Sequence, residues 1–210
     1  MTSKLHHVFV SGVHSSGKTT LLNYIKENVN EDDLNISIHE EVARRVVVEE
    51  GYTQKKLQDK MILTQLNHAI VRRMYSTMTT AIEASKTKTS EKFDVIIWDR
   101  WVIDPLTYLL EYVSESEFLK ATDSEEVIEM LELNRDKENS ILFLLAPHRE
   151  YLIDDGVRVQ TGGFDSSQRF HEQMKHICQK FNIEFVEIEE KSLELRAHFV
   201  IEQIRKKWLR

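Results

Sequence analysis

The sequence contains one cysteine and no hydrophobic run long enough to cross a membrane. A single cysteine cannot form an intrachain disulfide or a cysteine metal cluster, so we expect Cys178 to be an inert, half-buried thiol in a helix. No apolar stretch approaches the ~18 residues that a membrane span requires, and a strand pattern begins almost at the first residue, which leaves no room for a signal peptide. These absences predict an intracellular, cytoplasmic protein in a reducing compartment, without membrane contact.

Glycine and proline are scarce, with six and two copies in 210 residues. Linkers between domains are usually rich in such residues, and the chain has no such stretch, no low-complexity segment and no internal repeat. We therefore expect a single domain over residues 1–210. A composition of 41% hydrophobic and 30% charged residues is typical of a globular protein with a sizeable core.

Positive charge is also in short supply, since 28 lysines and arginines face 35 aspartates and glutamates. Broad binding to duplex nucleic acid needs clustered cations that displace counterions from phosphate. The net charge of -7 therefore argues against a nucleic-acid partner. Composition does not indicate an oligomeric state.

Short apolar segments alternate along the chain with segments of helical periodicity. Strands are expected at residues 5–11, 36–39, 93–98, 141–145 and 184–188. Helices are expected at residues 18–28, 42–51, 54–85, 105–113, 125–133 and 192–208, with one more between the last two strands. This alternation predicts an α/β fold in three layers, with a parallel sheet between two layers of helices. Ligands of such sheets bind outside the carboxyl ends of the strands.

The first predicted strand runs directly into a phosphate-binding motif. The motif is Gly12-Val13-His14-Ser15-Ser16-Gly17-Lys18-Thr19, followed by Thr20 in the first predicted helix. Its glycines permit close backbone approach, and the loop amides and the helix N-terminus face negative phosphates. We expect Lys18 to bridge the terminal phosphates of ATP or GTP as a catalytic residue, and the Thr19 hydroxyl to bind Mg2+. His14 is expected to contribute only its backbone.

Acidic residues follow two other predicted strands. Asp99 comes directly after the strand at 93–98 and before Arg100, where it would hold Mg2+ as a Walker B aspartate does. Glu41 ends the second predicted strand, with Arg44 one helical turn later, and would accept a proton from an attacking hydroxyl or complete the Mg2+ shell. Acids in the first turn of a helix also stabilise the helix dipole whatever the function, so both interpretations of Glu41 stay open.

Residues from about 148 to 170 have the composition of a mobile lid, with several glycines and charged residues. Arg158 and Arg169 would close over the transferring phosphoryl group and neutralise its developing charge. A surface loop with scattered charge has the same composition, so this alternative also stays open. His171 and His176 are expected on the surface of the helix that follows.

These residues together resemble the nucleoside and nucleotide kinase branch of P-loop proteins. The resemblance is closest to the small AAA-like domain that includes the ribosylnicotinamide kinase domain of bacterial NAD regulators. It spans about residues 5–205 and is carried by Gly12 to Thr19, Glu41-x-x-Arg44, Asp99-Arg100 with Asp104 and Tyr108, Tyr151 through Asp155-Gly156-x-Arg158, and Arg169.

The resemblance implies a five-stranded parallel core, a magnesium nucleotide as phosphoryl donor and a lid with arginines. It also implies that Glu41 or Asp99 serves as the base or the Mg2+ partner. Arg44, Arg100 and Asp104 would then bind the acceptor. The tryptophan at position 101, where thymidylate and deoxynucleoside kinases have serine or tyrosine, leaves the acceptor unassigned. Trp101, together with Trp98 and Tyr108, would line a substrate pocket or pack in the core.

The leading hypothesis is an ATP-dependent kinase that transfers the γ-phosphoryl group to a nucleoside, a nucleotide or a related ribosyl compound. Lys18, Arg158 and Mg2+ would stabilise charge, while Thr19 and Asp99 hold the metal and Glu41 positions or deprotonates the acceptor. The alternative is a regulatory NTPase in which ATP or GTP orders the lid to control a partner. The chain has no Asn-Lys-x-Asp sequence, which counts against an ordinary GTPase.

Overall fold

The computed structural model describes residues 5–29, 33–53, 55–86, 93–151 and 163–209. Five strands form one parallel sheet in the order β2-β3-β1-β4-β5. The strands are β1 (His6–Gly12), β2 (Leu34–His39), β3 (Phe93–Asp99), β4 (Ser140–Leu145) and β5 (Val186–Ile188). The five-stranded parallel sheet and its place in an α/β fold are thus confirmed, and every strand lies within two residues of its predicted position.

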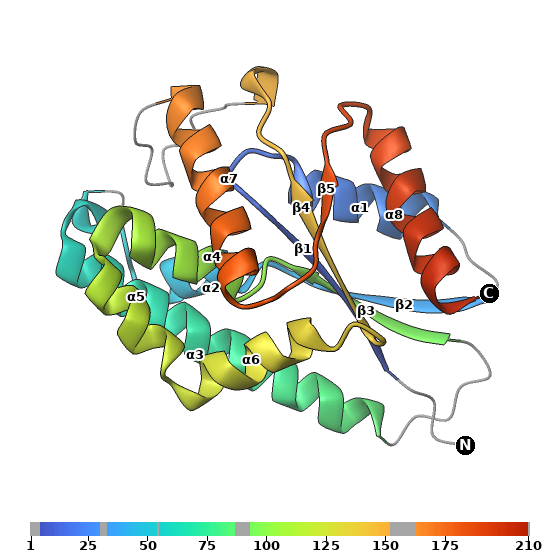
Figure 1. Cartoon of the computed structure of the whole chain (residues 1–210), viewed down its shortest axis with the longest axis horizontal. Coiled ribbons are helices and arrows are strands. Elements are labelled where there is room, and N and C mark those ends of the chain that lie inside the picture. Colours follow the sequence, from blue (N-terminus) through green and yellow to red (C-terminus); the bar gives the residue numbers. More distant parts are fainter. Residues whose placement is uncertain (1–4, 30–32, 54, 87–92, 152–162, 210) are drawn as a thin grey trace.

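Two layers of helices cover the sheet (Figure 1). One face carries α1 (Lys18–Asn28) and α8 (Leu193–Trp208). The helices that cover the other face are α2 (Val42–Glu49), α3 (Lys60–Ser85), α4 (Ile103–Tyr108), α5 (Glu115–Thr122), α6 (Glu125–Arg135) and α7 (Gly163–Lys180). Val8 and Val10 of β1 pack toward α1 and α8, whereas Phe9 packs toward the opposite layer, as alternation along a buried strand requires.

The central strand β1 pairs with β3 on one side and with β4 on the other. Its connection to β2 runs through α1 on one face, whereas β3 and β4 continue into helices on the opposite face. The connections therefore diverge at the carboxyl end of β1, which is where open α/β sheets bind their ligands.

Two of the predicted helices are divided in the structure. The helix predicted at 54–85 is a short 3-10 turn, η1 (Lys56–Gln58), followed by α3, because Asp59 caps α3 by accepting hydrogen bonds from the amides of Met61 and Ile62. The helix predicted at 105–113 is α4 continued by one π-helical turn, η2 (Leu109–Val113).

Helix α5 was not predicted, although Ser114 and Glu117 form the capping pattern Ser-x-x-Glu at its start. The Ser114 side chain accepts a hydrogen bond from the Glu117 amide at 3.2 Å. Within the described parts of the chain, no helix is both long and apolar enough to cross a membrane.

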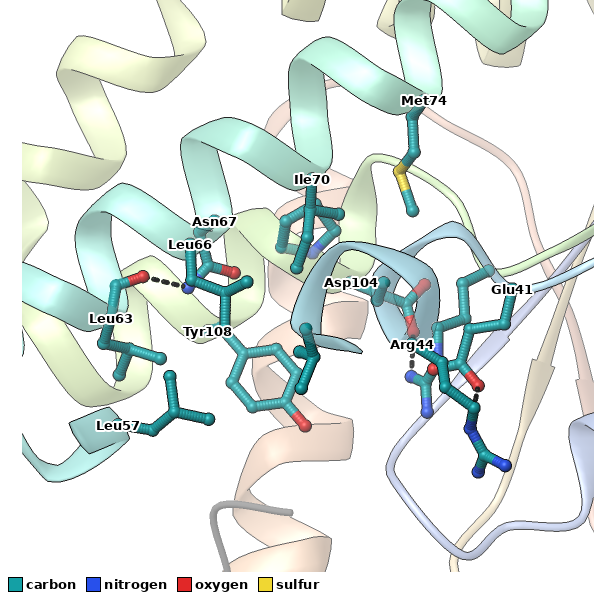
Figure 2. Close-up of a pocket in the computed structure, with 14 residues that line it drawn as sticks. Glu41, Arg44, Leu57, Leu63, Leu66, Asn67, Ile70, Met74, Asp104 and Tyr108 are labelled. Atoms are coloured by element: carbon teal, nitrogen blue, oxygen red, sulfur yellow. Dashed lines mark hydrogen bonds and ion pairs between the residues drawn. The ribbon is translucent and has the colours of Figure 1, made fainter. Parts of the chain in front are cut away.

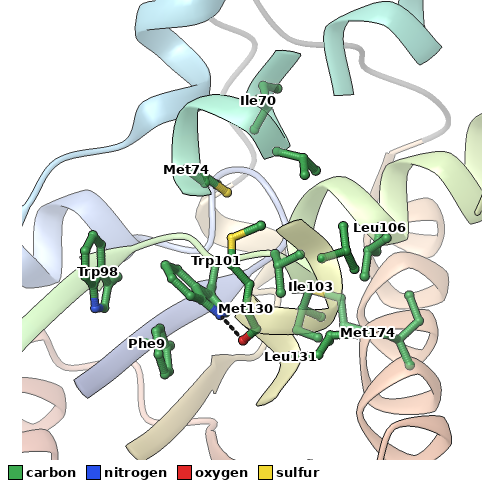
Figure 3. Packing of buried hydrophobic residues seen from close by; sticks show 14 of the residues in the cluster. Phe9, Ile70, Met74, Trp98, Trp101, Ile103, Leu106, Met130, Leu131 and Met174 are labelled. Carbon is green, nitrogen blue, oxygen red and sulfur yellow. Dashed lines mark hydrogen bonds between the residues drawn. The ribbon is translucent and has the colours of Figure 1, made fainter. Parts of the chain in front are cut away.

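Two tryptophans and the single cysteine are buried and have structural roles. Trp98 and Trp101 lie in the core beside Phe9, and the Trp101 indole donates a hydrogen bond to the Met130 carbonyl at 3.3 Å (Figure 3). Cys178 is fully rather than half buried, and burial raises the pKa of its thiol to about 12, so the thiol is inert.

The prediction that His171 lies on the helix surface is wrong. Its side chain is buried, and Nε2 lies 2.6 Å from Glu187 Oε1 of β5. The carboxylate provides the partner that a buried imidazole needs. His176 is exposed, as expected.

Candidate active site

The loop between β1 and α1 adopts a conformation that only its glycines permit. Gly12 has φ 151° and Gly17 has φ 86°. A Cβ atom at Gly12 would lie 2.8 Å from the Leu145 carbonyl oxygen, so no other residue fits there. Lys18 turns back along the loop, and its Nζ donates hydrogen bonds to the carbonyls of Gly12 at 2.8 Å and Val13 at 2.7 Å.

The ammonium group of Lys18 is buried among charged residues. Burial, followed by the positive charge of Arg100, lowers the pKa of Lys18 to about 7, although Asp104, Asp99 and Glu41 act in the opposite direction. An anion bound in the loop would favour the protonated form of Lys18. Any binding of an anion in this loop would therefore be coupled to the charge of this lysine.

Thr19 and Asp99 meet although 80 residues separate them. The Thr19 hydroxyl donates a 2.7 Å hydrogen bond to Asp99 Oδ2, whereas Asp99 Oδ1 is buried and has no hydrogen-bond partner among the described residues. Burial raises the pKa of Asp99, against the opposing effects of Arg100 and of the hydrogen bond from Thr19.

These two residues fit Mg2+, which prefers carboxylate and hydroxyl oxygens and would satisfy the unpartnered Oδ1 atom. The described parts of the chain contain no cluster of three or more histidine, cysteine, aspartate or glutamate side chains suited to a metal. This donor set suits an ion held jointly by protein and phosphates, as Mg2+ usually is at nucleotide sites.

Arg100 holds two carboxylates at the end of β3. Its Nε donates to Glu41 Oε1 at 2.6 Å, and its Nη1 donates to Asp104 Oδ1 at 2.8 Å. Only 7% of the Arg100 side chain and 15% of the Glu41 side chain are exposed. Burial alone would raise the pKa of Glu41, but the charges of Arg100 and Lys18 lower it, so Glu41 is ionised. Arg44 is 60% exposed, and its Nε lies 3.9 Å from Glu41 Oε2.

An apolar pocket of about 110 Å³ opens beside this ion-pair cluster. Figure 2 shows Glu41, Arg44 and Asp104 at one end and Leu57 and Leu63 at the other. The remaining lining residues are mainly apolar: Ala43, Val47, Leu66, Asn67, Ile70, Met74, Arg100, Pro105 and Tyr108.

Tyr108 lines this pocket, unlike the two tryptophans, which lie in the core. Burial raises the pKa of the Tyr108 hydroxyl to about 12, so it is neutral.

A second, larger cavity of about 530 Å³ lies at the phosphate-binding loop. Its loop-side lining consists of Ser15, Gly17, Lys18, Thr19, Thr20 and Arg100. Its other side is formed by Glu150, Tyr151, Lys191, Leu193 and Arg196, from η3 (Arg149–Tyr151), the β5–α8 connection and α8. Arg100 borders both this cavity and the apolar pocket, so one side chain lines the two spaces.

The structure brings most of the predicted site residues together at this edge of the sheet. Val13, His14 and Ser16 are buried within the loop itself. Arg169 borders neither cavity, because α7 directs it to Glu111, whose Oε1 lies 3.8 Å from its Nε. Its predicted role in nucleotide binding stays a prediction. Arg158 and the middle of the predicted lid fall in residues 152–162, outside the described residues.

Sequence reasoning missed Arg196 entirely. This arginine is buried in the first turn of α8, and its Nη1 donates to the Ser16 carbonyl at 2.9 Å. No local motif marks it, since 180 residues separate the two partners. The apolar residues of α3 that line the smaller pocket showed only the periodicity of an amphipathic helix in the sequence.

Comparisons with known proteins agree with this geometry. A family model described as an AAA domain matches residues 7–196. No curated protein sequence matches the chain. Among solved structures, the chain is similar to a NadR protein in complex with NR, at 19% identity and a TM-score of 0.68, over 98% of this chain and 52% of that one.

Two further structures have similar folds over almost their whole length. One is deoxyadenosine kinase from M. mycoides with bound dATP, at 15% identity and a TM-score of 0.62, over 95% of this chain and 99% of that one. The other is thymidylate kinase from Ehrlichia chaffeensis, at 15% identity and a TM-score of 0.56, over 95% and 98%. The chain thus spans about half the length of the NadR protein and nearly all of the two kinases. At these identities the likeness shows a P-loop kinase fold.

Proposed function

The chain belongs to the AAA domain family, whose model matches residues 7–196, and from this membership and the two cavities that Arg100 lines we propose that it is an ATP-dependent kinase. The donor, ATP or GTP, binds in the cavity of the phosphate-binding loop, and a small hydroxyl-bearing acceptor binds in the apolar pocket. One observation carries the proposal: Arg100 borders both cavities and holds Glu41 at 2.6 Å. Phosphoryl transfer depends on holding donor phosphate and acceptor oxygen within reach of each other.

On the donor side, the loop amides and Lys18 bind the terminal phosphates of the nucleotide. Thr19 and Asp99 would hold Mg2+, which would supply positive charge beside the phosphates. We propose that Arg158 supplies a further positive charge to the transferring phosphoryl group.

On the acceptor side, Glu41 accepts a hydrogen bond from the attacking hydroxyl. Because the pKa of Glu41 is lowered, the carboxylate is ionised and ready to take the hydroxyl proton as the oxygen bonds to the γ-phosphorus. Arg100 keeps the carboxylate in place, and Asp104 keeps Arg100 in place. The products are the phosphorylated acceptor and the nucleoside diphosphate.

The charges of the pocket favour an acceptor without a phosphate of its own. Among the described lining residues, two arginines face two carboxylates, and Arg100 already donates to both carboxylates. A phosphate dianion would therefore meet Glu41 and Asp104 with only the exposed Arg44 to offset them. A nucleoside or a related ribosyl compound fits better than a nucleotide. The likeness to a NadR protein bound to NR and to deoxyadenosine kinase supports the same class.

The test is ADP release from Mg-ATP in the presence of nucleosides, nucleoside monophosphates and nicotinamide riboside. We expect a nucleoside or ribosyl compound to stimulate release, and Lys18→Ala to abolish the stimulation. Lys26→Ala, a change on the same helix outside the loop, is the matched control and keeps the activity. Tight nucleotide binding without stimulation by any acceptor would contradict the kinase proposal and favour a regulatory NTPase.

A further inference from the structure

Arg196 joins three segments around the donor cavity. Its side chain is 2% exposed, its Nη1 donates to the Ser16 carbonyl at 2.9 Å, and its Nε donates to the Glu190 carbonyl. Its guanidinium carbon lies 5.2 Å from the centre of the Tyr151 ring. One buried arginine therefore contacts three segments: the phosphate-binding loop, the β5–α8 connection and the end of η3.

The positive charge of Arg196 has no carboxylate within ion-pair distance among the described residues. The nearby Glu190 carboxylate accepts instead from the backbone amides of Lys191 and Ser192, at 2.7 and 2.8 Å. Nη2 of Arg196 is buried and has no hydrogen-bond partner in the described part of the chain. A buried cation without an anion is costly, and this one lines the cavity in which the donor nucleotide is proposed to bind.

The bond to Ser16 acts on one peptide unit of the loop. The Ser16 carbonyl and the Gly17 amide belong to the same peptide plane, so a cation on the carbonyl fixes that plane. It also polarises the unit and makes the Gly17 N–H a stronger donor. In loops of this type such amides point at the bound phosphates.

Gly17 leaves room for this contact. A Cβ atom at position 17 would lie 3.0 Å from Nη1 of Arg196, so a side chain there would press on the guanidinium. The second glycine of the motif thus serves both the loop conformation, at φ 86°, and the approach of Arg196.

We propose that Arg196 is a positioning residue for the donor nucleotide. It holds the Ser16–Gly17 peptide with its N–H directed at the phosphates, and the phosphate chain supplies the counter-charge for the guanidinium. The effect concerns the phosphates rather than the base, because the contact is with the backbone of the phosphate loop. This inference rests on the proposed binding of a nucleotide by that loop.

The experiment compares calorimetric binding of Mg-ATP and of magnesium tripolyphosphate, which has no base. We expect Arg196→Met to raise the Kd of both ligands by a similar factor of roughly tenfold or more, the usual loss for a charged hydrogen bond. Arg196→Lys keeps the positive charge, so its Kd for both ligands should rise less than that of Arg196→Met. Arg205→Met is the control, since Arg205 lies on the same helix with 48% of its side chain exposed, and it should bind both ligands as the wild type does.

A purely structural role would disturb both substrates, so the KM of the acceptor is measured as well and should not change in Arg196→Lys. A loss confined to Mg-ATP would assign Arg196 to the base and overturn the inference, as would unchanged binding of tripolyphosphate. If Arg196→Met does not fold, Arg196→Lys and Arg196→Gln decide the question by the same comparison. Wild-type protein that binds neither ligand would instead refute nucleotide binding itself.

Discussion

Replacing Glu41 by glutamine tests the acceptor half of the site. Glutamine has nearly the same shape and can still accept the 2.6 Å hydrogen bond from Arg100 Nε, but it carries no charge and cannot take a proton. A positioned general base contributes ~10²–10⁴-fold to a rate. We therefore expect kcat to fall by about that factor, while the KM for ATP stays within about twofold, because Glu41 lines the proposed acceptor pocket and not the cavity of the phosphate-binding loop.

The stabilities of Glu41→Gln and Glu41→Ala should differ, because glutamine keeps the hydrogen bond to Arg100 and alanine removes it. Glu41→Gln weakens a charge-assisted hydrogen bond, at a cost of about 1 kcal/mol. Glu41→Ala leaves the buried Nε of Arg100 without its partner, at a cost of about 3 kcal/mol. For a chain of this size these costs correspond to Tm shifts of about 2–4 °C and about 6–12 °C.

The assay is acceptor-dependent ADP release at saturating ATP, with thermal unfolding followed in parallel. Glu40→Gln is the matched control, since it changes the neighbouring exposed glutamate, and it should keep both kcat and Tm. If Glu41→Gln retains more than about a tenth of the wild-type kcat, the assignment of Glu41 as the proton acceptor is refuted.

Three further outcomes follow from the same geometry. Glu41 has a lowered pKa in the folded protein, so its contribution to stability and activity is present above its ordinary pKa and is lost as the pH falls through the lowered value. Arg100→Gln removes the charge that offsets burial, so the acid limb of the kcat/KM profile should move to higher pH. An unmoved limb would contradict this coupling. Asp99→Asn should raise the Mg2+ concentration needed for half-maximal activity by roughly tenfold or more, the loss typical of a charged ligand. An unchanged Mg2+ dependence would remove Asp99 from the metal site. Cys178 should not react with a thiol reagent at pH 8 in the folded protein, because burial raises its pKa to about 12. Rapid labelling without denaturant would contradict the burial.

The parts of the site that follow from local sequence could be predicted. Gly12 to Thr19 is a contiguous motif, Asp99 ends the buried strand β3, and Glu41 follows β2 by two residues at the start of α2. Because the carboxyl ends of parallel strands meet at one edge of a sheet, their proximity to the loop followed from the strand assignment. The positions of β3 and β4 depended on nearly continuous apolar runs, which are strong signals for buried strands.

Contacts between distant segments could not be predicted. Glu41 and Arg100 were both named, but their 2.6 Å pair depends on how β3 and α2 approach each other. Arg196 reaches Ser16 from the far end of the chain and carries no motif. The position of His171 in a predicted helix gave no sign that Glu187 of β5 lies beside it.

The central claim is that the two cavities belong to one phosphoryl-transfer site. The most direct measurement is mass spectrometry of the acceptor after incubation with Mg-ATP labelled in the γ-phosphate. We expect a nucleoside or ribosyl product that is one phosphoryl group heavier and carries the label, and no such product with Lys18→Ala. Label recovered only as inorganic phosphate, with every acceptor unchanged, would contradict the account.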